Sequence, residues 1–170
     1  MIPTECRIGE EGQGFKFFTQ HFTYWRTAQS AATLGSAYAA FSRAMYYLKN
    51  RKCFSRPIGG FSHLQQELAY HLSRLTMCWL LVEKIMKGFD KNLDQYYEAC
   101  MLKAESLEVA IRVLTWSMKV HGARGCMECT LLEKRLRDLL ALRVADGVTD
   151  VLRSQVAKGL LGKELYELSL

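Results

Sequence analysis

The residues best suited to chemistry lie between positions 121 and 150, where a glycine-containing turn precedes a charged segment and an Asp-Gly pair. The carboxylate of Asp146 directly precedes Gly147, where a tight turn is expected between two helical segments. A carboxylate on such a turn either caps the following helix or works as an acid/base group. The pattern alone favours the cap, which is worth about 1 kcal/mol.

Cys126 and Cys129 form a second candidate site, because their spacing is that of redox or metal-binding pairs and His121 lies nearby. Zinc needs four protein ligands, or three and a water, and the sequence has no second pair. His121, at a helix end, is more typical of a cap or a partner of the helix dipole. The remaining four cysteines are scattered: Cys6, Cys53, Cys78 and Cys100. We therefore expect reduced cysteines and no bound metal.

The composition indicates one compact helical domain spanning residues 1–170. Hydrophobic residues make up 49% of the chain and charged residues 24%, with only 2 prolines. No apolar run approaches the length of a membrane span, and the N-terminus lacks a secretory pattern, so we expect a cytoplasmic protein. The net charge of +6 is spread along the chain, which argues against nucleic-acid binding and favours an anionic partner.

Hydrophobic periodicity predicts an all-α up-down bundle of three long helices and two shorter ones. The first expected helix covers residues 15–50, with a break near 22–24. The second covers 62–88, and the third ends at 121. The fourth covers 130–143, and the last runs from 147 or 149 to 162. Ser62 is the expected N-cap of the second helix, and Thr130 with Glu133 forms a capping box for the fourth. Residues 51–60 are expected to form a loop.

Three apolar stripes indicate how these helices pack. The first helix has a bulky stripe of Ala31, Leu34, Tyr38, Phe41, Met45 and Leu48, and a small-residue stripe of Ala28, Ala32, Gly35, Ala39 and Ser42. A helix that is apolar on two sides is expected to be sandwiched between neighbours. The core stripe expected for the second helix is Leu64, Leu68, Leu72, Leu75, Trp79, Val82 and Met86.

Short motifs follow one another along nearly the whole chain. They are Gly9-Glu-Glu-Gly-Gln-Gly-Phe15, Arg26, Arg51-Lys-Cys-Phe54, Pro57-Ile58, Phe61, His121-Gly122, Gly125, Glu133-Lys-Arg-Leu-Arg-Asp138, Asp146-Gly147 and Ala157-Lys-Gly-Leu-Leu-Gly162. The most specific spacings are the 25 residues from Arg26 to Arg51 and the 21 from Gly125 to Asp146. In type, order and spacing this set resembles the C-terminal helical domain of the acyl-CoA dehydrogenase flavoproteins.

The resemblance implies a catalytic role for Asp146, which stands where most members have a glutamate that removes the α-proton of an acyl thioester. A hydride then leaves the β-carbon for the flavin. In the family the backbone N–H of the base residue steadies the enolate oxygen, and the Gly147 turn leaves that N–H free. Arg26 is the expected partner of the Asp146 region. Aspartate is one methylene shorter than glutamate, so its reach differs.

The resemblance also implies that the chain contributes to a site for flavin adenine dinucleotide (FAD). Arg51 and Phe54 match residues that hold the nucleotide of a neighbouring subunit, and Gly122 and Gly125 match a glycine turn near its adenine end. Lys119 replaces a glutamine and brings a charge toward the pyrophosphate. The candidate cofactor-binding residues are therefore Arg51, Phe54, Lys119, Gly122, Gly125 and Gly147.

Members of the family also have an N-terminal helical domain and a middle β domain, and FAD and acyl-CoA lie between the middle and C-terminal parts. We therefore expect either a fragment cut from such an enzyme or one half of a split enzyme, whose partner chain supplies those domains. An acyl-CoA or acyl-carrier thioester is the expected substrate, and a homodimer or homotetramer through the long helices is the expected assembly. Two alternatives remain open. The chain is a non-redox helical scaffold or binding protein, or a flavin-free enzyme that uses Asp146 as an acid/base group.

Overall fold

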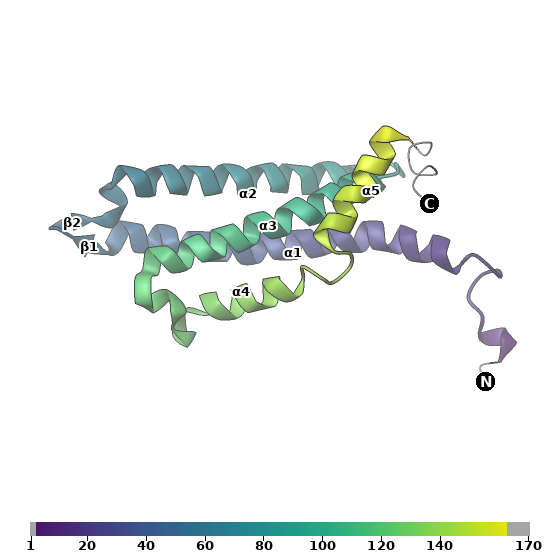
Figure 1. Ribbon diagram of the computed structural model, residues 1–170, viewed down its shortest axis with the longest axis horizontal. Helices are drawn as coiled ribbons and strands as arrows, with labels where there is room; N and C mark the ends of the chain where they lie inside the picture. The colour runs from purple at the N-terminus through teal and green to yellow at the C-terminus, as the bar shows by residue number, and fades with distance from the viewer. Residues whose placement is uncertain (1–2, 163–170) are drawn as a thin grey trace.

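A computed structural model describes residues 3–162 and shows an elongated helical bundle (Figure 1). The elements in order are η1 (Thr4–Cys6), α1 (Gly14–Asn50), β1 (Lys52–Cys53), β2 (Arg56–Pro57), η2 (Ile58–Gly60), α2 (Ser62–Phe89), α3 (Tyr96–His121), η3 (Gly122–Cys126), η4 (Glu128–Thr130), α4 (Leu132–Ala141) and α5 (Thr149–Leu161). Three long and two shorter α-helices confirm the predicted fold. The ends of the predicted domain, residues 1–2 and 163–170, lie outside the described residues.

Helix α3 is the centre of the bundle and packs against each of α1, α2, α4 and α5. Its buried residues run from Ala99 and Cys100 to His121 and cover most of the helix, while one stripe, with Met101, Arg112, Thr115 and Lys119, stays exposed. A helix buried over most of its circumference needs neighbours on several sides. Lys103, at 2% exposed, lies on the buried part.

Helix α1 is continuous, so the break predicted near residues 22–24 is wrong. The hydroxyl of Thr23 donates to the carbonyl of Thr19 one turn earlier, and the Phe22 ring stacks on that of Phe18 at 4.1 Å between centroids. The bulky stripe of α1 supplies the core, as predicted. The small-residue stripe does not, because all five of its residues are exposed and no helix of the described chain covers them.

The predicted core stripe of α2 is only partly right. The buried face consists of His71, Leu75, Cys78, Val82, Ile85 and Gly88. Leu72, Trp79 and Met86 are 45%, 38% and 38% exposed, so that part of the prediction is wrong. Because α2 is apolar on two adjacent sides, periodicity finds both stripes without showing which side faces α3.

The ends of the helices differ from the predicted caps. Phe61, Leu131 and Val148 are the N-caps of α2, α4 and α5, and none of these three residues makes a side-chain cap hydrogen bond. The predicted N-cap at Ser62 is therefore wrong, as is a cap at Asp146. The Thr130–Glu133 box is not formed as predicted, although the Thr130 hydroxyl accepts from the N–H of Leu132, the first residue of α4, at 3.4 Å and donates to the carbonyl of Met127 at 2.8 Å.

Residues 51–60 contain a small antiparallel hairpin where a loop was predicted, with Lys52 opposite Pro57 and Cys53 opposite Arg56. Its two turn residues, Phe54 and Ser55, both have positive φ angles, of 50° and 64°. Two such residues in succession are typical of the tight hairpin turn whose twist matches that of paired strands.

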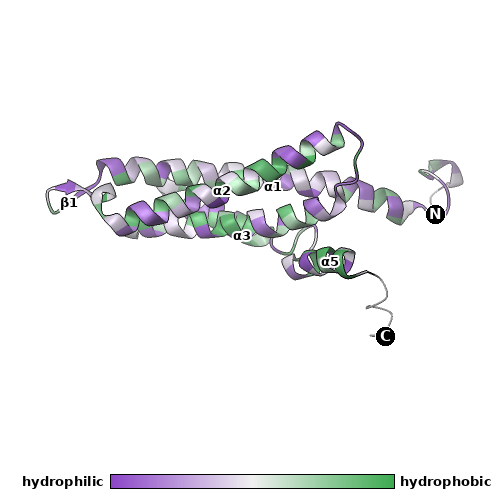
Figure 2. Ribbon diagram, turned by 90° about the horizontal axis from the view of Figure 1, so that it is seen from above, coloured by the Kyte–Doolittle hydropathy of each residue, from purple (hydrophilic) through white to green (hydrophobic). Residues whose placement is uncertain are grey.

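Hydrophilic and hydrophobic residues are mixed along every labelled helix (Figure 2). Accordingly, within residues 3–162 no helix combines the length and the apolar character needed to cross a membrane. All six cysteines are free, with Cys78 and Cys100 buried and the other four exposed.

Replacement of Gly125 by alanine is expected to destabilise the fold by about 2 kcal/mol or more, the scale of overpacking a rigid site. A Cβ atom there would lie 2.4 Å from the carbonyl oxygen of Met118, and backbone cannot move aside cheaply. Urea unfolding followed by circular dichroism measures the loss. Gly14→Ala is the control, because that position faces open space, and equal losses in both variants would contradict the packing described.

His71 should make stability depend on pH below neutrality. Burial lowers the pKa of its imidazole, and the nearby charge of Glu67 only partly opposes this. As the pH falls from 7.5 to 5.5 the unfolded chain takes up a proton that folded His71 resists, so the free energy of unfolding falls by up to about 1 kcal/mol. Urea unfolding at both pH values should show a smaller fall for His71→Gln. An identical fall in the variant would refute this origin.

Candidate functional site

The candidate site is built on the turn between α4 and α5, where Asp146 and Gly147 both have left-handed φ angles, of 55° and 108°. A side chain on Gly147 would meet the Leu152 side chain at 3.0 Å, in a backbone conformation that favours glycine. The backbone N–H of Asp146 donates to none of the described residues. The turn thus presents a carboxylate and a free N–H on the same residue.

Two donors from α1 hold the Asp146 carboxylate. Its Oδ2 atom accepts from the indole Nε1 of Trp25 at 3.0 Å and from the amide Nε2 of Gln29 at 2.8 Å. Because Gln29 turns its nitrogen toward Asp146, its Oε1 atom is left buried without a hydrogen-bond partner. Neither Trp25 nor Gln29 was predicted as a site residue, although both lie within one turn of Arg26.

Arg26 reaches the same turn, as predicted, but it binds the backbone rather than the carboxylate. Its Nε donates to the carbonyl of Asp146 at 3.0 Å, and its Nη1 lies 3.5 Å from the Cys100 sulfur. The guanidinium also lies over the rings of Phe22 and Tyr96, at 5.4 Å and 5.9 Å from their centroids. Burial raises the pKa of the Cys100 thiol, which is therefore a neutral neighbour.

Lys103 of α3 also reaches the turn and was not predicted. Its ammonium donates to the carbonyl of Gly147 at 2.6 Å and to that of Leu142 at 3.1 Å. Burial lowers the pKa of this ammonium, and the charge of Asp146 partly offsets that effect. The sequence does show a lysine within an apolar helical pattern, which could have indicated a buried charge. It could not indicate the acceptors, because backbone carbonyls have no sequence signature.

The predicted cofactor-binding residues fall into two groups. Gly147 lies at the Asp146 turn, whereas the others occur at the opposite end of the bundle, near the β1–β2 hairpin and η3 (Figure 1). At the hairpin, the ring of Phe54 is 86% exposed, and the Arg51 side chain makes no hydrogen bond or ion pair with a described residue. Both side chains are available to a ligand or to another molecule.

The turn at η3 contains Gly122, with a φ of 60°, and buried Gly125. A cavity of about 400 Å³ adjoins it, lined by Arg43, Tyr46, Tyr47, His121, Arg124, Met127, Cys129 and Thr130. Arg43 already donates to the carbonyls of Thr130 and Cys129, at 2.7 Å and 3.4 Å, so Arg124 and the two tyrosines are the groups that suit a ligand with phosphate and aromatic parts. His121 itself donates from Nδ1 to the Ser117 carbonyl, 2.7 Å away, near the end of α3.

The Lys119 ammonium is not free to bind an anion. Its ammonium pairs with Glu67 at 2.5 Å, and Trp116 donates to the other oxygen of that carboxylate at 3.1 Å. The Lys119 hydrogen bond holds the pKa of Glu67 below its usual value. Lys119 would have to leave this pair before it could reach a pyrophosphate.

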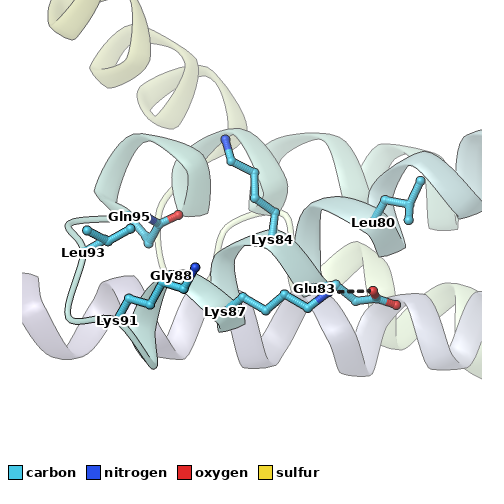
Figure 3. A pocket seen from close by; sticks show the side chains of 8 residues that line it. All are labelled: Leu80, Glu83, Lys84, Lys87, Gly88, Lys91, Leu93 and Gln95. Atoms are coloured by element: carbon cyan, nitrogen blue, oxygen red, sulfur yellow. Dashed lines mark ion pairs between the residues drawn. The ribbon is translucent and has the colours of Figure 1, made fainter.

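A basic groove of about 430 Å³ lies at the connection between α2 and α3 (Figure 3). Its lysines Lys84 and Lys87 pair with Glu98 and Glu83, at 3.5 Å and 3.7 Å. Gln95 separates this groove from a second cavity of about 580 Å³, which runs beside α1 to Tyr96. The second cavity thus reaches Tyr96, whose ring lies beside Arg26. Neither the groove nor this cavity is lined by a residue of the Asp146 turn.

Cys126 and Cys129 are both exposed. No group of three or more potential metal ligands occurs among residues 3–162.

The chain matches the family described as "Acyl-CoA dehydrogenase, C-terminal domain" over residues 12–161. It is 29% identical over 160 residues to a probable acyl-CoA dehydrogenase of Bacillus subtilis, covering 94% of this chain and 42% of the relative. It is 32% identical to the 3-sulfinopropanoyl-CoA desulfinase of Paraburkholderia xenovorans, with 94% and 41% covered. The chain therefore spans about two fifths of the length of these relatives.

The structure of butyryl-CoA dehydrogenase from Megasphaera elsdenii superposes with a TM-score of 0.91 at 27% identity, covering 95% of this chain and 42% of the other. An acyl-CoA dehydrogenase from Geobacillus kaustophilus gives a TM-score of 0.89 at 25% identity, with 94% and 42% covered. Fold, motif order and sequence agree, and the chain belongs to the acyl-CoA dehydrogenase family, whose C-terminal helical domain it matches.

Proposed function

We propose that this chain is the C-terminal helical part of an acyl-CoA dehydrogenase-like flavoenzyme that introduces an α,β double bond into an acyl thioester. The observation that carries the proposal is the Asp146 residue itself, whose carboxylate and unpaired backbone N–H lie on one turn. The carboxylate takes the α-proton, while the N–H donates to the thioester oxygen as negative charge develops there.

The resting carboxylate is occupied by Trp25 and Gln29, so substrate must compete with these donors or use the second carboxylate oxygen. Arg26 and Lys103 hold the carbonyls of Asp146 and Gly147 and so fix the backbone that carries the free N–H of Asp146. When bound, FAD would accept the hydride from the β-carbon. Arg51, Phe54, Gly122 and Gly125 suit the nucleotide of a neighbouring subunit, whereas Lys119 is committed to Glu67.

The relatives are more than twice as long as the aligned chain, so the proposed reaction also needs the N-terminal helical and middle β domains of the family. A partner polypeptide that carries these domains would complete the site. The substrate class is a coenzyme A or carrier-protein thioester. One relative is named an L-prolyl-[peptidyl-carrier protein] dehydrogenase of Pseudomonas fluorescens, which illustrates the second kind of carrier.

A second candidate function is a non-redox helical binding protein. It is favoured by one observation, which is that both Asp146 and Lys119 are satisfied by partners within the chain. In that case the turn would be a structural feature, and mutation of Asp146 would alter stability without altering a reaction.

We further propose that two copies associate through the exposed faces of α1 and α2. Tyr38 meets Trp79 edge-on at 6.4 Å between ring centroids, which brings the small-residue stripe of α1 beside the exposed bulky residues of α2. In a two-fold symmetric dimer, the small residues of α1 in one copy can pack against the bulky residues of α2 in the other, and the reverse. The face is therefore self-complementary.

Asp146→Asn should abolish dehydrogenation when the chain is combined with the missing domains of a relative. Loss of a positioned base lowers rates by about 10²- to 10⁴-fold. Reduction of a dye by an acyl thioester measures the rate, and visible absorbance measures bound flavin. Asp138→Asn, a surface change on α4, is the control. Normal flavin binding with an unchanged rate in Asp146→Asn would contradict the catalytic role.

Gly35→Leu tests the association surface. Nothing lies within 4 Å of a Cβ at this position, so the single chain should fold normally, whereas a second copy packed there would clash. Light scattering at micromolar concentration should give a dimer or tetramer for the unmodified chain and a monomer for the variant. The control is Gly14→Leu, the same change at the other end of α1 in open space. A monomeric unmodified chain would refute the association.

A further inference from the structure

The ammonium group of Lys103 is the least expected feature of the bundle. The residue is 2% exposed and is among the largest fully buried side chains of the described chain. Burying a charged group is costly unless it is paired and hydrogen-bonded. Among residues 3–162 no carboxylate pairs with Lys103, and its two acceptors are the backbone carbonyls of Leu142 and Gly147.

These two carbonyls delimit the segment that carries Asp146. Leu142 directly follows α4, and Gly147 is two residues before α5 begins. One ammonium therefore joins both ends of a six-residue connection to the central helix. Within that connection Arg26 of α1 binds the Asp146 carbonyl, so cations from two helices hold three of its carbonyls.

The turn needs such support because its conformation is unfavourable. Asp146 has a φ of 55°, and a non-glycine residue in the left-handed region costs about 1–2 kcal/mol. No backbone hydrogen bond from Asp146 or Gly147 closes the turn. The carbonyl contacts of Arg26 and Lys103 are thus the backbone interactions that oppose relaxation to an ordinary conformation.

We infer that Lys103 is a positioning residue that sets the conformation of the 142–147 connection and thereby the place of the Asp146 carboxylate. The effect of Lys103 on catalysis rests on the proposed function. Its effect on the conformation of the connection does not, because that can be measured in the chain alone. Lys103 does not touch the carboxylate. It acts through the backbone, whereas Trp25 and Gln29 act on the side chain.

The indole N–H of Trp25 is a direct reporter, because it donates to Asp146 Oδ2. The Trp116 indole is an internal reference, because it donates to Glu67, away from the turn. In proton–nitrogen correlation spectra, Lys103→Met should shift the Trp25 indole peak and speed its hydrogen exchange at least tenfold. The Trp116 peak should stay in place, and Trp25→Phe assigns the signals.

Lys134→Met is the matched control, because it makes the same change on the surface of α4, where Lys134 pairs only with Asp138. If Lys103→Met does not fold, Lys103→Gln supplies the test, since its shorter amide can reach one carbonyl but not both. A folded Lys103 variant with an unchanged Trp25 peak and exchange rate would overturn the inference.

The same variants separate this inference from the proposed reaction. Asp146→Asn leaves the carbonyl contacts intact, so the Arg143 and Val144 amides, which donate to Leu140 and Ala141, should keep their exchange rates. In Lys103→Met those amides should exchange at least tenfold faster. If Lys103→Met loosens the connection but the completed complex of the unmodified chain shows no dehydrogenation, the proposed reaction fails and the positioning role stands.

Discussion

The candidate site depends on how the backbone carbonyls of one short connection are satisfied. Leu142, Asp146 and Gly147 direct their carbonyl oxygens at cations that project from α1 and α3. Long side chains on regular helices thus replace the backbone hydrogen bonds that an ordinary turn would form within itself. As a result the N–H of Asp146 stays free, which is the property that makes the turn suited to an anionic oxygen.

That arrangement also explains why α3 has to occupy the centre of the bundle. Lys103 can approach the connection only from a helix that is buried beneath both α4 and α5, and α3 packs on each. The cost of burying the ammonium is offset by hydrogen bonds to backbone atoms rather than by an ion pair. Cys100, one turn earlier on α3, contacts the Arg26 guanidinium, so the Arg26 and Lys103 cations reach the connection from two neighbouring helices.

Contacts within the chain already occupy two of the side chains that could bind a ligand. Asp146 is held by Trp25 and Gln29, and Lys119 is held by Glu67. Any ligand at either place must compete with donors or acceptors that are already in contact. Arg51 and Phe54 differ, because they project from the hairpin without a polar partner in the described chain, and so are free to contact a neighbouring molecule.

The sequence by itself determined the all-α class, the five helices and the family, because these depend on periodicity and on motif spacing, which are local or one-dimensional. It also connected Arg26 with Asp146 through the family pattern. It could not decide which apolar side of α2 faces α3, since Leu72 and Trp79 repeat with the same period as the buried residues. Nor could it identify Trp25, Gln29 and Lys103, or the occupation of Lys119 by Glu67. These contacts join residues 39 to 121 positions apart, and those of Lys103 end on backbone carbonyls, so they exist only after the helices have packed.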